Sequence, residues 1–248
     1  MKKTSTTLRI LSLFILISLV GLSTSCTTQQ ITSALGSITG VPLTKEEIAS
    51  ALKDALIQGV TKGTGLASQD GGYFNNALIK IPFPEDAEKV ATKLRSLGLG
   101  SEVDKFVKTL NQGAEEAAKE AAPIFKSAIT SMSIKDASAI LKGDKDAATQ
   151  YLIGATTEQL KAKFKPIMSK NLAKVNATRY YTDLVGKYNQ IPFVTNVNPD
   201  LDDYATEKAI EGLFKLVAQE EGNIRTDISA RSSELMKKVF AQAPQAQQ

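Results

Sequence analysis

The chain has 248 residues, with 30 basic and 26 acidic side chains, no histidine and a single cysteine. The lack of histidine excludes zinc sites of the usual His/Cys kind and catalysis by Ser-His or Cys-His pairs. One cysteine cannot build an intramolecular disulfide framework, even in an oxidising compartment.

The N-terminal segment has the order of an export signal. Met1-Lys2-Lys3 and Arg9 give a cationic start, residues 10–22 are almost wholly apolar, and Ser23-Thr24-Ser25 lead into Cys26. This order is typical of a signal peptide cleaved at a small-residue site. A lone cysteine directly after that site is typical of bacterial lipoproteins, so we predict acylation of Cys26 and attachment to a membrane. Ser23 stands where lipoproteins usually carry Leu, and the alternatives are an ordinary secretory signal and an uncleaved anchor.

Cleavage before Cys26 leaves a mature chain with 27 basic and 26 acidic residues, so its net charge falls from +4 to +1. We therefore expect no nucleic-acid partner, since such proteins carry a broad positive surface. Thr27 replaces the aspartate that retains enteric lipoproteins at the inner membrane, which favours the periplasmic face of the outer membrane. A soluble periplasmic or secreted protein is the alternative location.

The mature chain divides by composition into a flexible tether, a domain and a tail. We predict a signal peptide over residues 1–25, the tether over 26–43, a single helical domain over 44–240 and a disordered tail over 241–248.

The domain has the pattern of successive amphipathic helices. Thr44 and Glu47 form a Thr-x-x-Glu capping box before apolar residues at spacings of three and four, and Gly63 and Gly65 are expected to end that helix. Ser133 with Asp136 predicts a second capped helix that ends at Gly143. Further helix starts are predicted at Pro84, Ser101, Asp144, Thr157, Asp200 and Asp227, with a kink or a new helix start at Pro123 and a bend near Pro166. The sequence thus predicts an all-α multi-helix bundle.

Two short segments are candidates for strands. Residues 78–81 read Leu-Ile-Lys-Ile before Pro82, and residues 191–193 repeat the Ile-Pro-Phe of residues 81–83. We expect at most a minimal two-stranded element that pairs residues 78–81 with residues 193–197.

Blocks of sequence along the domain carry a family resemblance. They include Asn111-Gln112-Gly113-Ala114-Glu115, Ala121-Ala122-Pro123-Ile124-Phe125, Ile140-Leu141-Lys142-Gly143, Ala147-Ala148-Thr149-Gln150-Tyr151 and Glu220-Glu221-Gly222-Asn223-Ile224-Arg225-Thr226-Asp227. In this order they resemble the DUF4197 family of uncharacterised bacterial envelope proteins, over about residues 52–240. Gly113 and Ile228 depart from the Ala and Pro that the family favours. The resemblance implies an export signal and a helical fold, but no activity.

Two acid–arginine pairs near the C-terminus are candidate sites. Glu221 with Arg225 and Asp227 with Arg231 are each four residues apart with the acid first, the favourable order on a helix. Arg225 and Arg231 are candidate contacts for an anionic ligand, a lipid headgroup or a partner. The interpretation that we favour is a salt-bridge lattice, in which Glu221 and Asp227 are structural polar nodes.

Asn111 and Glu115 are also four residues apart, on a helix that continues through the alanine-rich residues 114–122. Buried polar groups need hydrogen-bond partners. We favour a structural polar node formed by these two side chains over the lining of a ligand pocket.

The turn-rich stretch over residues 68–80 gathers polar and aromatic groups, and loops on rigid scaffolds often carry binding residues. Its candidate contacts for a ligand or partner are Asp70, Tyr73, Asn75, Asn76 and Lys80. A well-satisfied connecting loop is the simpler interpretation.

We expect no metal site and no cofactor. Residues 196–207 have part of the spacing of a calcium loop, but Leu201 occupies the position that requires glycine. An Asx/Pro turn followed by acids in the first turn of a helix explains the same residues.

Three functions remain open from the sequence. A membrane-tethered, non-catalytic binding or scaffold module that docks an envelope protein ranks first. A carrier that holds a lipid or other apolar ligand between helices ranks second. A carboxylate-dependent enzyme ranks third, because no catalytic motif is recognisable.

Overall fold

The structure, a computed structural model, describes residues 42–96, 98–174, 176–190, 192, 196–198 and 200–242. Within these residues every regular element is a helix, which confirms the all-α prediction. The helices are α3 (Lys45–Ser68), η1 (Glu85–Ala87), α4 (Glu88–Ser96), α5 (Gly100–Ala118), α6 (Ala121–Ser131), α7 (Ile134–Lys142), α8 (Ala147–Leu172), α9 (Asn176–Asn189), α10 (Leu201–Thr226), η2 (Ile228–Ala230) and α11 (Glu234–Gln242). The predicted signal peptide, Cys26 and the tether to residue 41 lie outside the described residues, as do residues 243–248 of the predicted tail.

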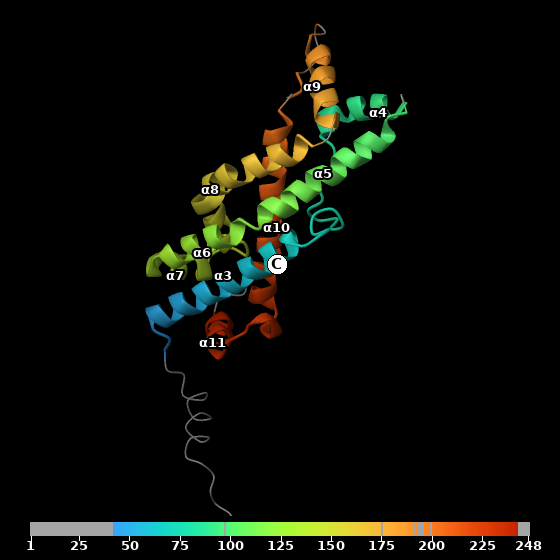
Figure 1. Cartoon of the computed structure of the whole chain (residues 1–248). Coiled ribbons are helices and arrows are strands. Elements are labelled where there is room, and N and C mark those ends of the chain that lie inside the picture. The colour runs from blue at the N-terminus through green and yellow to red at the C-terminus, as the bar shows by residue number, and fades with distance from the viewer. Residues whose placement is uncertain are drawn as a thin grey trace, which may run out of the picture. The chain divides into compact units, whose positions relative to one another are not determined.

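Helix α10 is the central element of the bundle, since it packs against α3, α5 and α8 (Figure 1). Its buried positions include Ala205, Ala209, Leu213, Phe214, Leu216 and Val217. These positions lie on more than one face, as expected for a helix covered on several sides. An aromatic contact at 5.6 Å between ring centroids joins Phe214 to Phe125 of α6.

Helix α3 continues past Gly63 and Gly65, where we expected it to end, so that prediction is wrong. Gly63 has no positive φ, and a Cβ built on it would lie 3.5 Å from the carbonyl carbon of Leu216. The glycine therefore serves close packing of α3 on α10 instead of ending the helix. The end comes at Ser68, and the chain turns at Gly71, whose φ is +75°.

The locally encoded helix starts are confirmed. The Thr44 side chain accepts the N–H of Glu47 at 3.1 Å, and Glu47 accepts the N–H of Thr44 at 2.8 Å. Ser133 and Asp136 form the same reciprocal capping box at the start of α7. Each box needs only residues three apart, which explains why the sequence suffices to predict it.

Of two expected helix boundaries, the restart near Pro123 is confirmed and the start at Thr157 is wrong. Pro123 lies in the first turn of α6, where its missing N–H costs nothing, and the chain breaks before it at residues 119–120. The two helices expected from Asp144 and Thr157 are one helix, α8, with Pro166 inside it.

The strand expected over residues 78–81 is not formed, which corrects that prediction. The Asn111 side chain accepts the N–H of Ile81 and donates to its carbonyl, both at 2.8 Å. One amide thus satisfies both backbone groups that a neighbouring strand would have bonded. The Asn189 side chain likewise accepts the N–H of Val197 at 2.9 Å and donates to its carbonyl at 2.8 Å. Residues 193–195 of the expected partner strand lie outside the described residues.

Candidate functional site

Glu115 fastens the loop after α3 to the C-terminal part of α5. Its Oε1 accepts the backbone N–H groups of Tyr73 and Phe74, each at 3.1 Å. The Glu115 residue is only 6% exposed, and Asn111, one turn earlier, is fully buried. The loop is thereby held through its backbone, so the two α5 side chains form a structural junction whose hydrogen-bonding groups point into the protein.

Tyr73 is the one aromatic candidate of the loop, and it is fully buried. Its hydroxyl donates to the carbonyl of Ala209 in α10 at 2.6 Å. Burial, and then the nearby charge of Glu115, raise the pKa of the Tyr73 phenol well above its ordinary value. The phenol therefore stays neutral and joins the loop to α10.

The remaining candidates of the loop do not converge on one site. Asp70, Asn75 and Lys80 are exposed, and Lys80 lies over the ring of Phe74 at 4.3 Å. Asn76 is half-buried and accepts the N–H of Leu78 at 3.0 Å. These side chains either contact other residues of the loop or are exposed to solvent.

Glu221 of α10 caps the N-terminal end of α8 from outside that helix. Its Oε1 accepts the N–H of Ala148 at 3.0 Å, and its Oε2 accepts the N–H and the hydroxyl of Thr149, both at 2.8 Å. The residue that precedes α8, Asp146, provides no side-chain cap. A carboxylate at this position also complements the positive end of the helix dipole.

Arg225, one turn later on α10, bonds both Glu221 and the C-terminal end of α7. Its guanidinium lies 2.8 Å from Glu221 Oε1 and donates to the carbonyls of Ile140 at 3.0 Å and Leu141 at 3.5 Å. The two side chains are 10% and 5% exposed. A single ion pair therefore caps two helix ends of opposite polarity, the C-terminal end of α7 and the N-terminal end of α8. It thereby holds the turn between these two helices.

The second predicted pair, Asp227 with Arg231, is not an ion pair in the described part of the chain. Asp227 is the residue after α10, and its carboxylate accepts the N–H and the hydroxyl of Ser229, both at 2.8 Å. Arg231 donates to the carbonyls of Ile224 and Arg225, each at 2.9 Å, and so caps the C-terminal end of α10. Arg231 is 8% exposed, so the cap is itself buried.

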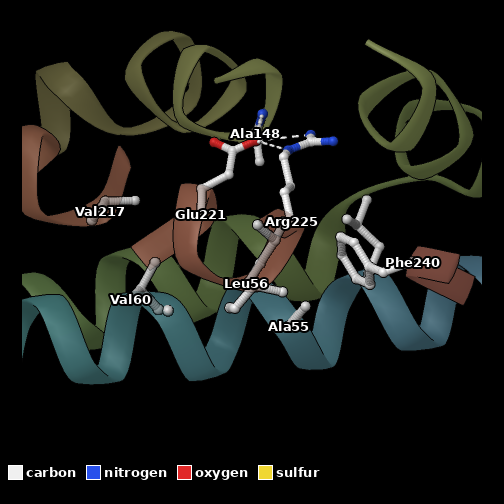
Figure 2. A pocket seen from close by; sticks show the side chains of 11 residues that line it. Ala55, Leu56, Val60, Ala148, Val217, Glu221, Arg225 and Phe240 are labelled. Atoms are coloured by element: carbon white, nitrogen blue, oxygen red, sulfur yellow. Dashed lines mark hydrogen bonds and ion pairs between the residues drawn. The ribbon is translucent and has the colours of Figure 1, made fainter. Parts of the chain in front are cut away.

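A small core cavity lies beside the Glu221–Arg225 pair. Figure 2 shows both side chains leaving α10 close together, with the apolar Leu56 and Val60 of α3 and Phe240 of α11 around the space below them. Its volume is about 20 Å³, which is room for about one water molecule.

An open groove runs along the outer side of α8 and α10, and we name it the α8–α10 groove. These helices are antiparallel, since Glu221 near the end of α10 meets the start of α8 while Asp202 bonds Ser169 near its end. The volume of the groove is about 430 Å³. Its residues are Asp146, Thr149, Gln150, Ile153, Thr157, Lys161, Glu207, Ile210, Glu211, Phe214, Lys215 and Ala218.

The acids near the start of α10 serve the helix itself. Asp200 accepts the N–H groups of Asp202 and Asp203, at 3.0 and 3.1 Å, as an ordinary N-terminal cap. Among the described residues no group of three or more His, Cys, Asp or Glu side chains is placed to hold a metal ion. No helix in that same part of the chain combines the length and the apolar character that crossing a membrane requires.

The match to known families covers the whole described domain. The sequence model of a family described as a protein of unknown function (DUF4197) matches residues 42–241. The chain belongs to this family. No curated protein and no solved structure matches the chain.

The DUF4197 domain also uses polar residues that the sequence did not single out. Thr149 donates to Glu221, Asn189 bonds Val197, and Glu220 is paired with Lys62 at 2.9 Å. Most of these bonds join residues far apart in sequence or end on backbone atoms, for which the sequence offers no pattern. For the polar residues that the sequence did single out, the signal was the four-residue spacing of Glu221 with Arg225 and of Asn111 with Glu115.

Proposed function

We propose that this DUF4197 protein is a non-catalytic binding module, held at the periplasmic face of the outer membrane through an acylated Cys26. In this proposal the α8–α10 groove docks an amphipathic segment of an envelope protein. The anchor rests on the N-terminal pattern, with its cationic start, apolar stretch and lone cysteine.

The observation that carries the docking role is the contrast between the interior and the surface of the domain. The core cavity measures about 20 Å³, whereas the α8–α10 groove measures about 430 Å³ and is open along two long helices. Pockets for small molecules usually enclose about 300–1,000 Å³. The carrier alternative therefore has no support from this core cavity, while a surface segment has room to bind.

The chemistry of the groove favours a helical segment with an apolar stripe. Ile153 is half-buried at the groove, and the apolar Ile210 and Phe214 also line it but are only 4% and 7% exposed. Charges of both signs, such as Glu211 and Lys215, lie beside them. A groove between two helices accepts an amphipathic helix through apolar anchors at spacings of three and four. We expect the partner segment to carry both acidic and basic residues beside its anchors, because the groove presents both signs.

Glu211 of the groove is poorly suited to general acid catalysis. Glu211 lies 2.8 Å from both Lys208 and Lys215. Hydrogen bonds from Lys208 and then Lys215 lower the pKa of the Glu211 carboxyl, so it stays ionised at neutral pH. A general acid must hold a proton at the working pH. This supports a binding role for the groove over a catalytic one.

Site-specific photo-crosslinking in the native envelope tests the docking site. A photoreactive residue at Ile153 or Ala218, both half-buried in the groove, should give the same discrete adduct. The matched control is Ile228, an exposed apolar residue on η2, which should not give it. Adding Lys215→Glu to the Ile153 probe should weaken the adduct, since it reverses one charge at the groove. No adduct at the groove positions, or the same adduct at Ile228, would refute the docking site.

The anchor is tested separately by intact mass and membrane partitioning. The native protein should carry acyl mass and sediment with membranes, and the Cys26→Ser variant should be released. Equal solubility of the two proteins without acyl mass would contradict the anchor and leave the groove experiment unaffected.

A further inference from the structure

A second hollow lies where the start of α3 meets α7, and we name it the α3–α7 hollow. It measures about 560 Å³, and its residues are Lys45, Ile48, Ile134, Lys135, Ser138, Leu141 and Lys142. Three of these are lysines and none is an acid. Ile134 is 42% exposed, which makes it one of the few large apolar side chains on the described surface. The hollow therefore combines concentrated positive charge with an exposed apolar side chain.

The lysines of the hollow are not held in ion pairs. Lys45, Lys135 and Lys142 form no ion pair with any acid of the described residues. Four acids lie within two residues of these lysines in sequence, namely Glu46, Glu47, Asp136 and Asp144, and none of them lines the hollow. Glu47 accepts the N–H and hydroxyl of Thr44, and Asp136 accepts those of Ser133. Both carboxylates are thus engaged by helix starts, and the lysine ammonium groups face solvent.

The hollow also lies at the part of the domain nearest in sequence to Cys26. Helix α3 begins at Lys45, which lines the hollow. The chain from Cys26 to Lys45 can span at most about 65 Å even when fully extended. A lipid on Cys26 would therefore hold the start of α3 within about 65 Å of the bilayer surface.

We propose that the α3–α7 hollow rests on the membrane, with its three lysines on anionic lipid headgroups and Ile134 in the interface. Clustered lysines near a bilayer are each attracted to anionic lipid by about 1 kcal/mol, which is about fivefold in affinity. Long lysine stems reach headgroups while an apolar neighbour enters the interface. One lipid chain anchors only marginally, so a basic surface beside the anchor adds to attachment and fixes the domain's orientation.

This inference goes beyond the proposed docking groove and uses other residues. It is tested without the acyl chain, so its failure and that of the anchor are distinguishable. The probe is the mature chain with Cys26→Ser, mixed with vesicles of phosphatidylcholine alone or with phosphatidylglycerol, followed by co-sedimentation in 0.1 M salt. We expect binding only to the anionic vesicles, and release in 1 M salt, where the Debye length falls from about 10 to about 3 Å.

Charge variants then locate the contact. Lys45→Gln/Lys135→Gln/Lys142→Gln should weaken partitioning about a hundredfold. The control Lys105→Gln/Lys108→Gln/Lys163→Gln removes the same charge from exposed lysines of α5 and α8 and should change partitioning less than about threefold.

Three results would overturn the proposal. The first is no preference of the parent chain for anionic vesicles, and the second is an equal loss in both triple variants. The third is binding of a soluble poly-glutamate peptide without binding of vesicles, which would assign the hollow to an acidic protein segment. Unfolding midpoints of the two variants within a few degrees of the parent confirm that all three chains are folded.

Discussion

The Glu221–Arg225 pair gives the sharpest test of how the bundle is held together. Replacing Glu221 with Gln keeps the size and shape of the side chain but removes its charge and one acceptor oxygen. The carboxylate is 5% exposed, and its two oxygens accept from Ala148, Thr149 and Arg225. A glutamine cannot accept all of these bonds, because its amide nitrogen is only a donor.

The least costly orientation of the new amide determines the size of the effect. In this orientation the amide nitrogen of the new glutamine faces Thr149. The Thr149 hydroxyl can then rotate to accept a hydrogen bond from it, but the backbone N–H of Thr149 loses its partner. An unsatisfied buried N–H costs about 1–3 kcal/mol. Arg225 also keeps a full charge at 10% exposure without its carboxylate, and breaking a buried ion pair typically costs about 3–5 kcal/mol. We expect Glu221→Gln to lower the free energy of unfolding by about 3–5 kcal/mol.

The assay is urea unfolding of the mature Cys26→Ser chain at pH 7, followed by circular dichroism. The matched control is Glu211→Gln on the same helix, because Glu211 is half-exposed and paired with two surface lysines. Such surface pairs contribute about 0–1 kcal/mol. The cost of Glu221→Gln should also persist in 1 M salt, since buried pairs are little screened.

A double-mutant cycle separates the ion pair from the helix cap. Arg225→Met removes the guanidinium and keeps an apolar stem. The loss of stability in the double variant should be about 2 kcal/mol smaller than the sum of the two single losses. A loss under about 1 kcal/mol for Glu221→Gln, or one equal to that of Glu211→Gln, would refute the reasoning. The link between α7, α8 and α10 would then rest on apolar packing alone.

Other positions give predictions that the same urea assay checks. Asn111→Ala should cost about 3 kcal/mol, because it leaves the buried N–H and C=O of Ile81 without partners. The control Asn75→Ala, at an exposed position, should change stability by less than about 0.5 kcal/mol. Equal effects of the two substitutions would count against the junction. Gly154→Ala should stabilise by about 0.5–1 kcal/mol, because its Cβ meets nothing within 4 Å. Gly72→Ala should destabilise, because its Cβ would collide with backbone carbonyls of α3, and a neutral result would contradict that close approach. Burial, and then a nearby carboxylate, raise the pKa of Tyr73, so its contribution to stability is complete below about pH 10 and is lost above it, as the unfolded chain ionises. Tyr73→Phe should therefore flatten the fall of the urea midpoint between pH 10 and 11.5, and an unchanged slope would show that Tyr73 ionises freely in the fold.

Features that depend on neighbours in sequence were predicted correctly. The capping box of Thr44 with Glu47 spans three residues, and the ion pair of Glu221 with Arg225 spans one helical turn. In each case the interacting groups belong to one helix or its immediate end, so their spacing in sequence fixes their distance.

The four-residue spacing of an acid and an arginine gave a wrong prediction where the two residues do not share one helix. Asp227 and Arg231 have the favourable order, but α10 ends at Thr226, so no common helix brings the two side chains together. The Ile-rich segment before Pro82 has strand character, yet Asn111 occupies its backbone groups and no ladder forms. Both predictions failed because a local preference was overridden by what the rest of the chain supplied.

The sequence by itself determined that this protein is a bundle of amphipathic helices with defined starts, because periodicity and capping are short-range. Only the tertiary structure decided what the buried polar side chains bond. Glu115, Glu221 and Arg225 all find backbone groups of segments 41 or more residues away. Every residue offers the same N–H and C=O, so no pattern of side chains can indicate which of them a distant carboxylate or guanidinium will meet.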